Sequence, residues 1–347
     1  MQNNIWYKIA FILAAAKNAC IKYRLYGVNA LSITHDFFYI YKSKMVATLV
    51  ISLDTELAWG AHDKKSYKHL TDWHINRRNI TGMLHLFEQY NIPVTWAVVG
   101  HLFLNGCSGH SVSNYPDKWF DEDPKGKFNH NTKLWYGPDI IEMIVNSCVD
   151  HEIGLHSFSH IIFDKVTSDI AHQEMVLAMD AAKSYGLHPI SFVFPREAVD
   201  HLDILKEHGI KIFRRPGVGI EANFPLPRKL RKFIRECFFP YPGSISQFND
   251  EGGIFSVTSS TNLCGWGLLQ NGQKHLYQVL KFKKIDATLK KAIKLQSMVH
   301  LDAHPHNFQD ESDLMYLDRV LSLIARYREC GVILTETMGE VYRRLAV

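Results

Sequence analysis

Residues 46–56 read VATLVISLDTE, and this stretch decides the fold. Its first eight residues are mostly apolar and several are β-branched, which is typical of a strand buried on both faces of a parallel sheet. Two acids, Asp54 and Glu56, follow where the apolar run stops. A buried strand that ends in paired carboxylates predicts an α/β protein with polar chemistry at the carboxyl end of its sheet.

From this strand to the C-terminus, strand-like and helix-like segments alternate. Further strands are expected at 94–99, 152–155, 192–194, 210–213, 253–258, 298–301 and 332–334. Helices are expected at 74–90, 139–146, 168–185, 201–208, 274–296 and 312–328, with a last helix after a capping box of Thr337 and Glu340. About seven parallel strands with helical crossovers predict a distorted (β/α) barrel, in which chemistry gathers where strands end.

The chain divides at its first strand. Residues 45–347 are expected to form one catalytic domain, interrupted by an aperiodic, aromatic-rich loop insertion at 105–138. Residues 1–44 are expected to be an extension, helical or poorly ordered. Its apolar run, 9–16, is shorter than the ~20 residues that a membrane-spanning helix needs, so no transmembrane segment is expected there.

The bulk composition is that of an ordinary globular protein, with 46% hydrophobic and 21% charged residues. Its 39 basic and 35 acidic residues nearly balance, which argues against a nucleic-acid partner. The six cysteines form no CxxC pair and are expected to be free, mostly buried thiols. Free thiols favour a cytoplasmic location, with a periplasmic or membrane-associated one as the alternative. The oligomeric state is left open.

The segment HSFSH, residues 156–160, follows a predicted strand. Its two histidines, four residues apart, would meet on one face of a helical turn. With Glu56 at the end of the first strand they make a His₂-carboxylate set, the composition of catalytic zinc sites that keep a position for water. The sequence therefore predicts that Glu56, His156 and His160 hold a divalent ion, with Zn²⁺ as the best fit.

Three further residues are candidates for proton transfer. Asp54 is free to act as a general base, and Arg196, after another strand, could hold it ionised through a bidentate pair. Residues 301–307 read LDAHPHN, and His304, which Asp302 could orient, would donate a proton to a leaving group. His306 is the alternative acid.

The 105–138 insertion offers candidates for a sugar site. Trp119, Trp135 and Tyr136 could stack on a pyranose ring, and three acids could bind its hydroxyl groups: Asp117, Asp121 and Asp123. The alternative is a loop that its own aromatic side chains anchor.

In this order, the clusters resemble the polysaccharide deacetylase family, the NodB-homology or carbohydrate esterase family 4-like domain. The resemblance covers Met45 to about the C-terminus and rests on SLDTE, NIPVTWAVVG, EIGLHSFSH and LDAHPH. It departs from the family in two ways. The two acids are spaced D-x-E, and Arg196 follows Pro195 where the family usually has an arginine before a proline. Arg214 and Arg215, which precede Pro216, are therefore second candidates for the residue that orients the base. The resemblance implies hydrolysis of N-acetyl groups on a polysaccharide or surface-glycan precursor.

Several other functions share parts of this pattern. An O-acetyl esterase or another amidohydrolase would use the same metal site. A glycosyltransferase could bind a metal–nucleotide through D-x-E, but it leaves HSFSH and LDAHPH without a role. A catalytically inactive carbohydrate-binding relative is disfavoured by the presence of both Asp54 and His304.

Overall fold

The computed structural model describes residues 46–63, 73–107, 115–121, 123, 132–217, 245–264 and 271–346. All of them belong to one compact unit, residues 46–347. The expected extension at 1–44 and parts of the 105–138 insertion lie outside the described residues.

One sheet contains all ten strands of the described residues. These are β1 (Ala47–Thr55), β2 (Thr95–Val98), β3 (Glu152–Leu155), β4 (Ser191–Val193), β5 (Ile212–Arg215), β6 (Phe248–Asp250), β7 (Phe255–Thr258), β8 (Thr261–Asn262), β9 (Met298–Ala303) and β10 (Ile333–Glu336). Their order is β6-β7-β5-β4-β3-β2-β1-β9-β8, and β10 also pairs with β1. Only β6 and β7 pair antiparallel.

The sheet curls because one short segment of the chain pairs with strands on opposite sides of the sheet. Strands β7 and β8 are two residues apart; β7 pairs with β5, whereas β8 pairs with β9. Residues 255–262 thus act as one interrupted strand that connects the two sides of the sheet. Together with β1 to β5 and β9 it makes seven parallel strands around the barrel, which confirms the predicted distorted (β/α) barrel.

Strand β1 is the centre of the barrel wall. All nine of its residues are buried, as its apolar composition predicts. Along one edge it pairs first with β10 and then with β2, and along the other it pairs with β9. This pairing fixes the register of the strand that ends in Asp54 and Glu56.

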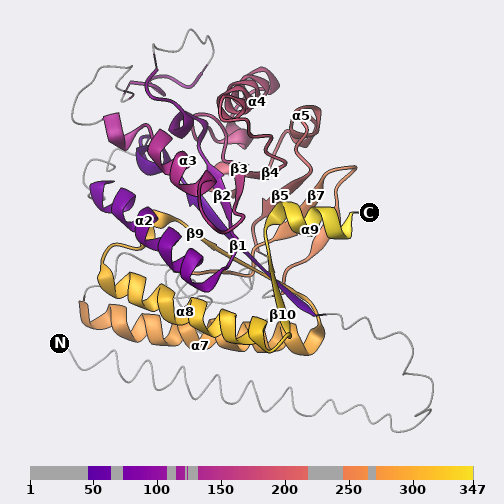
Figure 1. Ribbon diagram of the computed structural model, residues 1–347. Helices are drawn as coiled ribbons and strands as arrows, with labels where there is room; N and C mark the ends of the chain where they lie inside the picture. Colours follow the sequence, from indigo (N-terminus) through magenta and orange to yellow (C-terminus); the bar gives the residue numbers. More distant parts are fainter. Residues whose placement is uncertain are drawn as a thin grey trace, which may run out of the picture. The chain divides into compact units, whose positions relative to one another are not determined.

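Helices cover the outside of the sheet, and α2, α8 and α7 lie side by side over β1 and β9 (Figure 1). The α-helices are α2 (Trp73–Tyr90), α3 (Pro138–Val145), α4 (Ser168–Lys183), α5 (Leu202–Glu207), α7 (Asn271–Leu295), α8 (Glu311–Glu329) and α9 (Met338–Leu345). Short 3₁₀ turns are η1 (Leu57–Gly60), η3 (Gly100–Phe103), η4 (Thr132–Leu134), η5 (Phe163–Lys165), η6 (Pro195–Glu197) and η8 (Pro305–Asn307). The predicted capping box of Thr337 and Glu340 is present at α9, and Asp310 with Asp313 forms a second one at α8.

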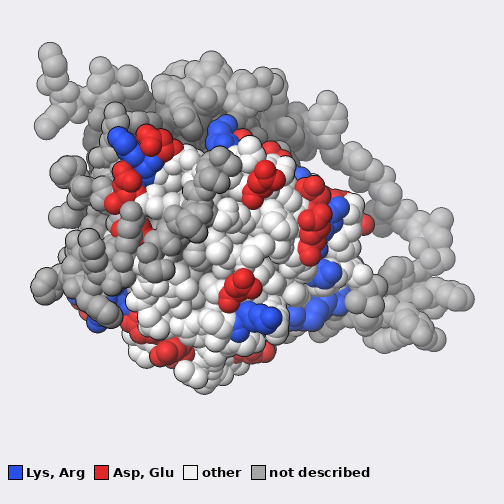
Figure 2. Space-filling model, turned by 90° about the horizontal axis from the view of Figure 1, so that it is seen from above, with Lys and Arg blue, Asp and Glu red and all other residues white. Residues whose placement is uncertain are grey.

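On the face seen in Figure 2, Lys and Arg are interspersed with Asp and Glu. No described helix is both long and apolar enough to cross a bilayer. Four cysteines are described as free; Cys264 is buried, Cys107 is half-buried, and Cys148 and Cys330 are exposed. The expectation of mostly buried thiols is therefore wrong for these four, because two of them lie in surface turns at helix ends.

Candidate metal centre

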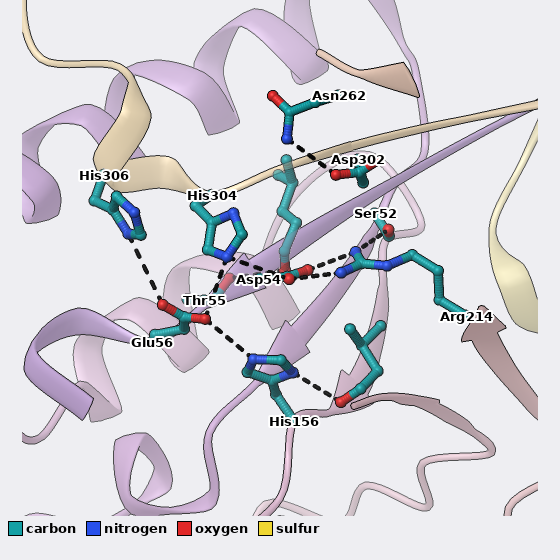
Figure 3. Close-up of polar contacts among 12 residues, drawn as sticks. Ser52, Asp54, Thr55, Glu56, His156, Arg214, Asn262, Asp302, His304 and His306 are labelled. Carbon is teal, nitrogen blue, oxygen red and sulfur yellow. Dashed lines mark hydrogen bonds and ion pairs between the residues drawn. The ribbon is translucent and has the colours of Figure 1, made fainter. Parts of the chain in front are cut away.

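The side chains that the sequence singled out meet at the carboxyl ends of the strands (Figure 3). Asp54 and Glu56 come from the end of β1, His156 follows β3, Arg214 lies on β5 and His304 follows β9. Carboxyl ends of parallel strands share one edge of a barrel, so residues far apart in sequence converge there.

Glu56, His156 and His160 form the centre of this cluster. The Nε2 atoms of both histidines lie 3.1 Å from Glu56 Oε1. All three residues are buried, and one donor atom from each lies within 4.8 Å of the others. Two nitrogens and one oxygen at this spacing are the donor set of a catalytic zinc site.

The hydrogen bonding of His156 fits a cation. Its Nδ1 donates to the carbonyl oxygen of Val193 at 2.8 Å, and its Nε2 faces the Glu56 carboxylate, so a neutral ring, the form that binds a metal, would turn the lone pair of Nε2 toward Glu56. A lone pair facing an anion is repelled, whereas a cation between them would bind both. A backbone carbonyl that fixes the ring of a metal-binding histidine is the usual outer contact of such ligands.

The two histidines meet through a bent loop, not through the helical turn that their spacing suggested. Ser157 and His160 have φ of 59° and 61°, in the left-handed region. Glu174 of α4 holds the loop: its Oε2 accepts the N–H groups of Phe158 and Ser159, both at 2.8 Å, and its Oε1 accepts the Ser159 hydroxyl. A buried acid on a neighbouring helix therefore sets the shape of the HSFSH motif.

Burial and neighbouring charge act in opposite directions on Glu56. Burial alone would raise the pKa of this carboxyl group. The nearby His304 and His160 outweigh burial and hold the pKa well below its usual value. Glu56 is therefore charged at neutral pH, as a metal ligand must be.

Asp54 is clamped by Arg214. The two guanidinium nitrogens donate to its two carboxylate oxygens, each at 2.6 Å. Arg214 also donates to Ser52 Oγ at 2.9 Å, and Ser52 Oγ lies 2.8 Å from Nε2 of His300. Burial would raise the pKa of Asp54, but Arg214 outweighs it and lowers the pKa to about 2.

The expectation that Arg196 orients the base is wrong. Arg196 has φ of 55° in η6, and its guanidinium pairs with Asp63 instead of Asp54. Arg215, the other candidate, pairs with Glu251. Arg214 reaches Asp54 because side chains alternate along β5, so that Arg214 points into the barrel and Arg215 does not.

His304 lies between the two acids. Its Nε2 is 3.5 Å from Asp54 Oδ2 and 3.4 Å from Glu56 Oε1. Burial alone would lower its pKa, but these two carboxylates raise it to about 9. His306 is farther away, with Nδ1 3.9 Å from Glu56 Oε2. Asp302 does not orient His304; it binds Ser259 and Asn262.

The aromatic residues proposed for sugar stacking are not available for it. Trp119, Trp135 and Tyr136 are 9%, 5% and 3% exposed and pack in the core. Trp119 donates to Ser159 Oγ at 2.9 Å, and Tyr136 donates to Asp123. They anchor the insertion behind the HSFSH loop, which was the alternative interpretation.

Some residues that shape this site show no recognisable pattern in the sequence. Ser52, His300 and Glu174 act through other side chains, and only their burial and hydrogen bonds identify them. Gly60 in η1 is another: a Cβ at this position would lie 1.8 Å from Oε2 of Glu56. The absence of a side chain there leaves room for the Glu56 carboxylate.

No protein-family model and no curated protein sequence matches the chain. Solved structures do match it. A protein assigned as a polysaccharide deacetylase from Mycobacterium smegmatis aligns over 92% of this chain and 94% of its own, with a TM-score of 0.58 and 11% identity. The Puue allantoinase aligns over 87% and 91%, with a TM-score of 0.52 and 11% identity.

A 4-alpha-glucanotransferase from Thermococcus litoralis also shares the fold. It aligns over 86% of this chain and 40% of its own, with a TM-score of 0.50 and 10% identity. These likenesses show that the chain has the NodB-like barrel fold found in deacetylase structures. Because proteins with different reactions share this barrel, the site must carry the functional argument.

Proposed function

We propose that this protein is a metal-dependent hydrolase that removes N-acetyl groups from a carbohydrate. One observation carries the proposal: the buried Glu56 carboxylate contacts two histidine Nε2 atoms at 3.1 Å, with Asp54 and His304 beside it. This set would supply a cation site, a base and an acid at the carboxyl ends of the strands.

Glu56, His156 and His160 are the residues that would hold the ion, of which Zn²⁺ fits the donor set best. When bound, such an ion polarises the acetyl carbonyl and makes water a stronger acid. Asp54, kept ionised by Arg214, accepts a proton at Oδ2, the oxygen that faces His304. Arg214 fixes the orientation of this carboxylate and cannot itself give up a proton.

His304 supplies the second proton. The Asp54 carboxylate, 3.5 Å from Nε2, favours the protonated form of its ring. The nitrogen of the departing sugar amine requires a proton as its bond to the acetyl carbon breaks. His304 Nε2 faces the same space as Asp54 and Glu56, so it is placed to donate that proton.

Burial indicates the direction of approach. The side chains of Asp54, Glu56 and His156 are at most 4% exposed, whereas those of His304 and His306 are about one-third exposed. The acetyl group would therefore enter past the two histidines, and the sugar would remain at the open rim.

The test combines metal analysis with acetate release. The His156→Ala,His160→Ala variant should lose the ion of this site and all activity on N-acetylated glycans. Asp54→Asn should keep the ion and lose about 10²–10⁴ in rate. Full metal content and activity in the double variant would disprove the proposal.

Substrate arms of the same assay separate the remaining alternatives. Release of acetate only from O-acetylated sugars would indicate an esterase. Hydrolysis of a cyclic amide without acetate release would favour another amidohydrolase. One structure of similar fold is named as an allantoinase, which belongs to that reaction class.

A further inference from the structure

A second group of metal-binding side chains lies behind the HSFSH loop. His101 follows β2 in η3, Cys107 lies just beyond it, and Asp123 belongs to the insertion. One donor atom from each lies within 4.8 Å of the other two. We propose that these residues bind a second divalent cation, with Zn²⁺ as the best fit, and that this ion has a structural role.

The orientation of His101 and Asp123 supports this assignment. His101 Nδ1 donates to the carbonyl oxygen of Phe158 at 2.8 Å, and its Nε2 faces Asp123 Oδ2 at 4.0 Å. The other oxygen of Asp123 accepts the Tyr136 hydroxyl. His101 and Asp123 are thus each held by an outer partner and turn one atom toward each other, as metal ligands do.

The chemistry of the three donors selects the ion. A thiol, an imidazole and a carboxylate suit zinc, whereas Mg²⁺ and Ca²⁺ prefer oxygen ligands. Tetrahedral zinc places its donors roughly 3.3–3.6 Å apart, so the cluster would tighten slightly on binding, with water as the fourth donor. Cys107 would lose its thiol proton to solvent and bind as thiolate, with no change in oxidation state.

The position of the cluster explains what the ion would do. The side chains of His101 and Asp123 are 0% exposed and Cys107 is half-buried, which suits a structural site better than a substrate site. The His101 ring lies 4.0 Å from the rings of both Trp59 and Phe158. A cation here would fasten the 105–138 insertion to the segments that carry the first metal ligands.

Cobalt substitution tests the site without reference to activity. A thiolate bound to Co²⁺ gives a charge-transfer band in the near-ultraviolet, and the Glu56, His156 and His160 set contains no thiolate. The wild-type protein should bind two Co²⁺ per chain and show the band. Cys107→Ser should lose the band and one ion, and Cys148→Ser, which removes an exposed thiol elsewhere, should change neither.

The two sites can be separated in the same experiment. His156→Ala,His160→Ala should keep the band and lose the other ion, so failure of the proposed function would leave this result intact. If Cys107→Ser does not fold, zinc should still slow alkylation of Cys107 in the wild-type chain, as mapped by mass spectrometry. One ion per chain without the band, or equal alkylation with and without zinc, would overturn the second site.

Discussion

At the scale of single residues, Asp54 and Arg214 form a buried ion pair in which each side chain is 3–4% exposed. Removing one partner leaves an uncompensated buried charge, which costs about 3–5 kcal/mol. Arg214→Met should therefore reduce the free energy of unfolding by several kcal/mol and raise the pKa of Asp54. Urea denaturation measures the change in stability, and the pH dependence of acetate release measures the change in the pKa of Asp54. Activity should also fall sharply.

Arg196→Met is the matched control. Arg196 is 34% exposed and pairs with Asp63, and exposed pairs contribute about 0–1 kcal/mol. This variant should stay close to the wild type in stability. Equal losses in the two variants would contradict the assignment of Arg214.

His300 is a second residue whose burial has a measurable effect. It is fully buried beside Ser52, and burial, reinforced by Arg214, lowers its pKa to about 3. Between about pH 6.5 and 3 the unfolded chain binds a proton on this ring and the folded chain does not. This group therefore makes the protein less stable as pH falls through that window.

His300→Gln removes this dependence and keeps a polar group near Ser52. Between pH 6 and pH 4, the slope of unfolding free energy against pH should decrease by up to about 1.4 kcal/mol per pH unit. Urea titrations at several pH values measure it. Parallel slopes for the two proteins would show that His300 is not held neutral.

At the scale of elements, the short turn η1 passes closely over Glu56. A methyl group on Gly60 would occupy the position of the Glu56 carboxylate oxygen. Gly60→Ala should displace this ligand and weaken metal binding by about 10–100-fold, the usual effect of disturbing the surroundings of a metal ligand. Competition with a zinc indicator gives the affinity.

Gly137→Ala is the comparison for that change. Its added Cβ would meet Ile140 Cδ1 at 3.3 Å, a contact that a flexible side chain can relieve, and the position lies at the start of α3. Metal affinity should be unchanged there. A wild-type affinity in Gly60→Ala would mean that Glu56 is not the ligand.

The elements also show how far sequence could lead. Buried strands and amphipathic helices have strong periodicity, so β3 was predicted at its observed bounds and most other elements to within a few residues. Residues at strand ends were correctly brought together, because parallel strands share one edge. The choice of Arg214 over Arg196 depends on which way each side chain points. For Arg196 that direction follows from its positive φ in η6, which the residue type does not predict.

The burial of Trp119 and Tyr136 was beyond prediction for a related reason. An aromatic side chain in an aperiodic loop serves equally well as a binding surface or as an anchor. Only its neighbours, here Ser159 and Asp123, decide between the two. Strand β8, with two residues, is likewise too short to give a pattern.

At the scale of the whole molecule, bound metal should stabilise the fold, because the ligands converge only in the native barrel. An ion at a hundredfold excess over Kd contributes about 2.7 kcal/mol, and the unfolding temperature Tm should rise by several degrees. Calorimetry with zinc and with chelator measures the shift. His156→Ala,His160→Ala should show a smaller shift, and an unchanged one would place the stabilising ion elsewhere.

The pairing of β1 also bears on how the protein loses activity. This strand is hydrogen-bonded along both edges, to β10 and β2 on one and to β9 on the other. Its backbone amides can therefore exchange with solvent only when neighbouring strands separate. Asp54 and Glu56, the proposed base and metal ligand, lie at the end of this doubly paired strand, so we expect heat inactivation to follow the unfolding of the barrel and not a local loosening of these two residues.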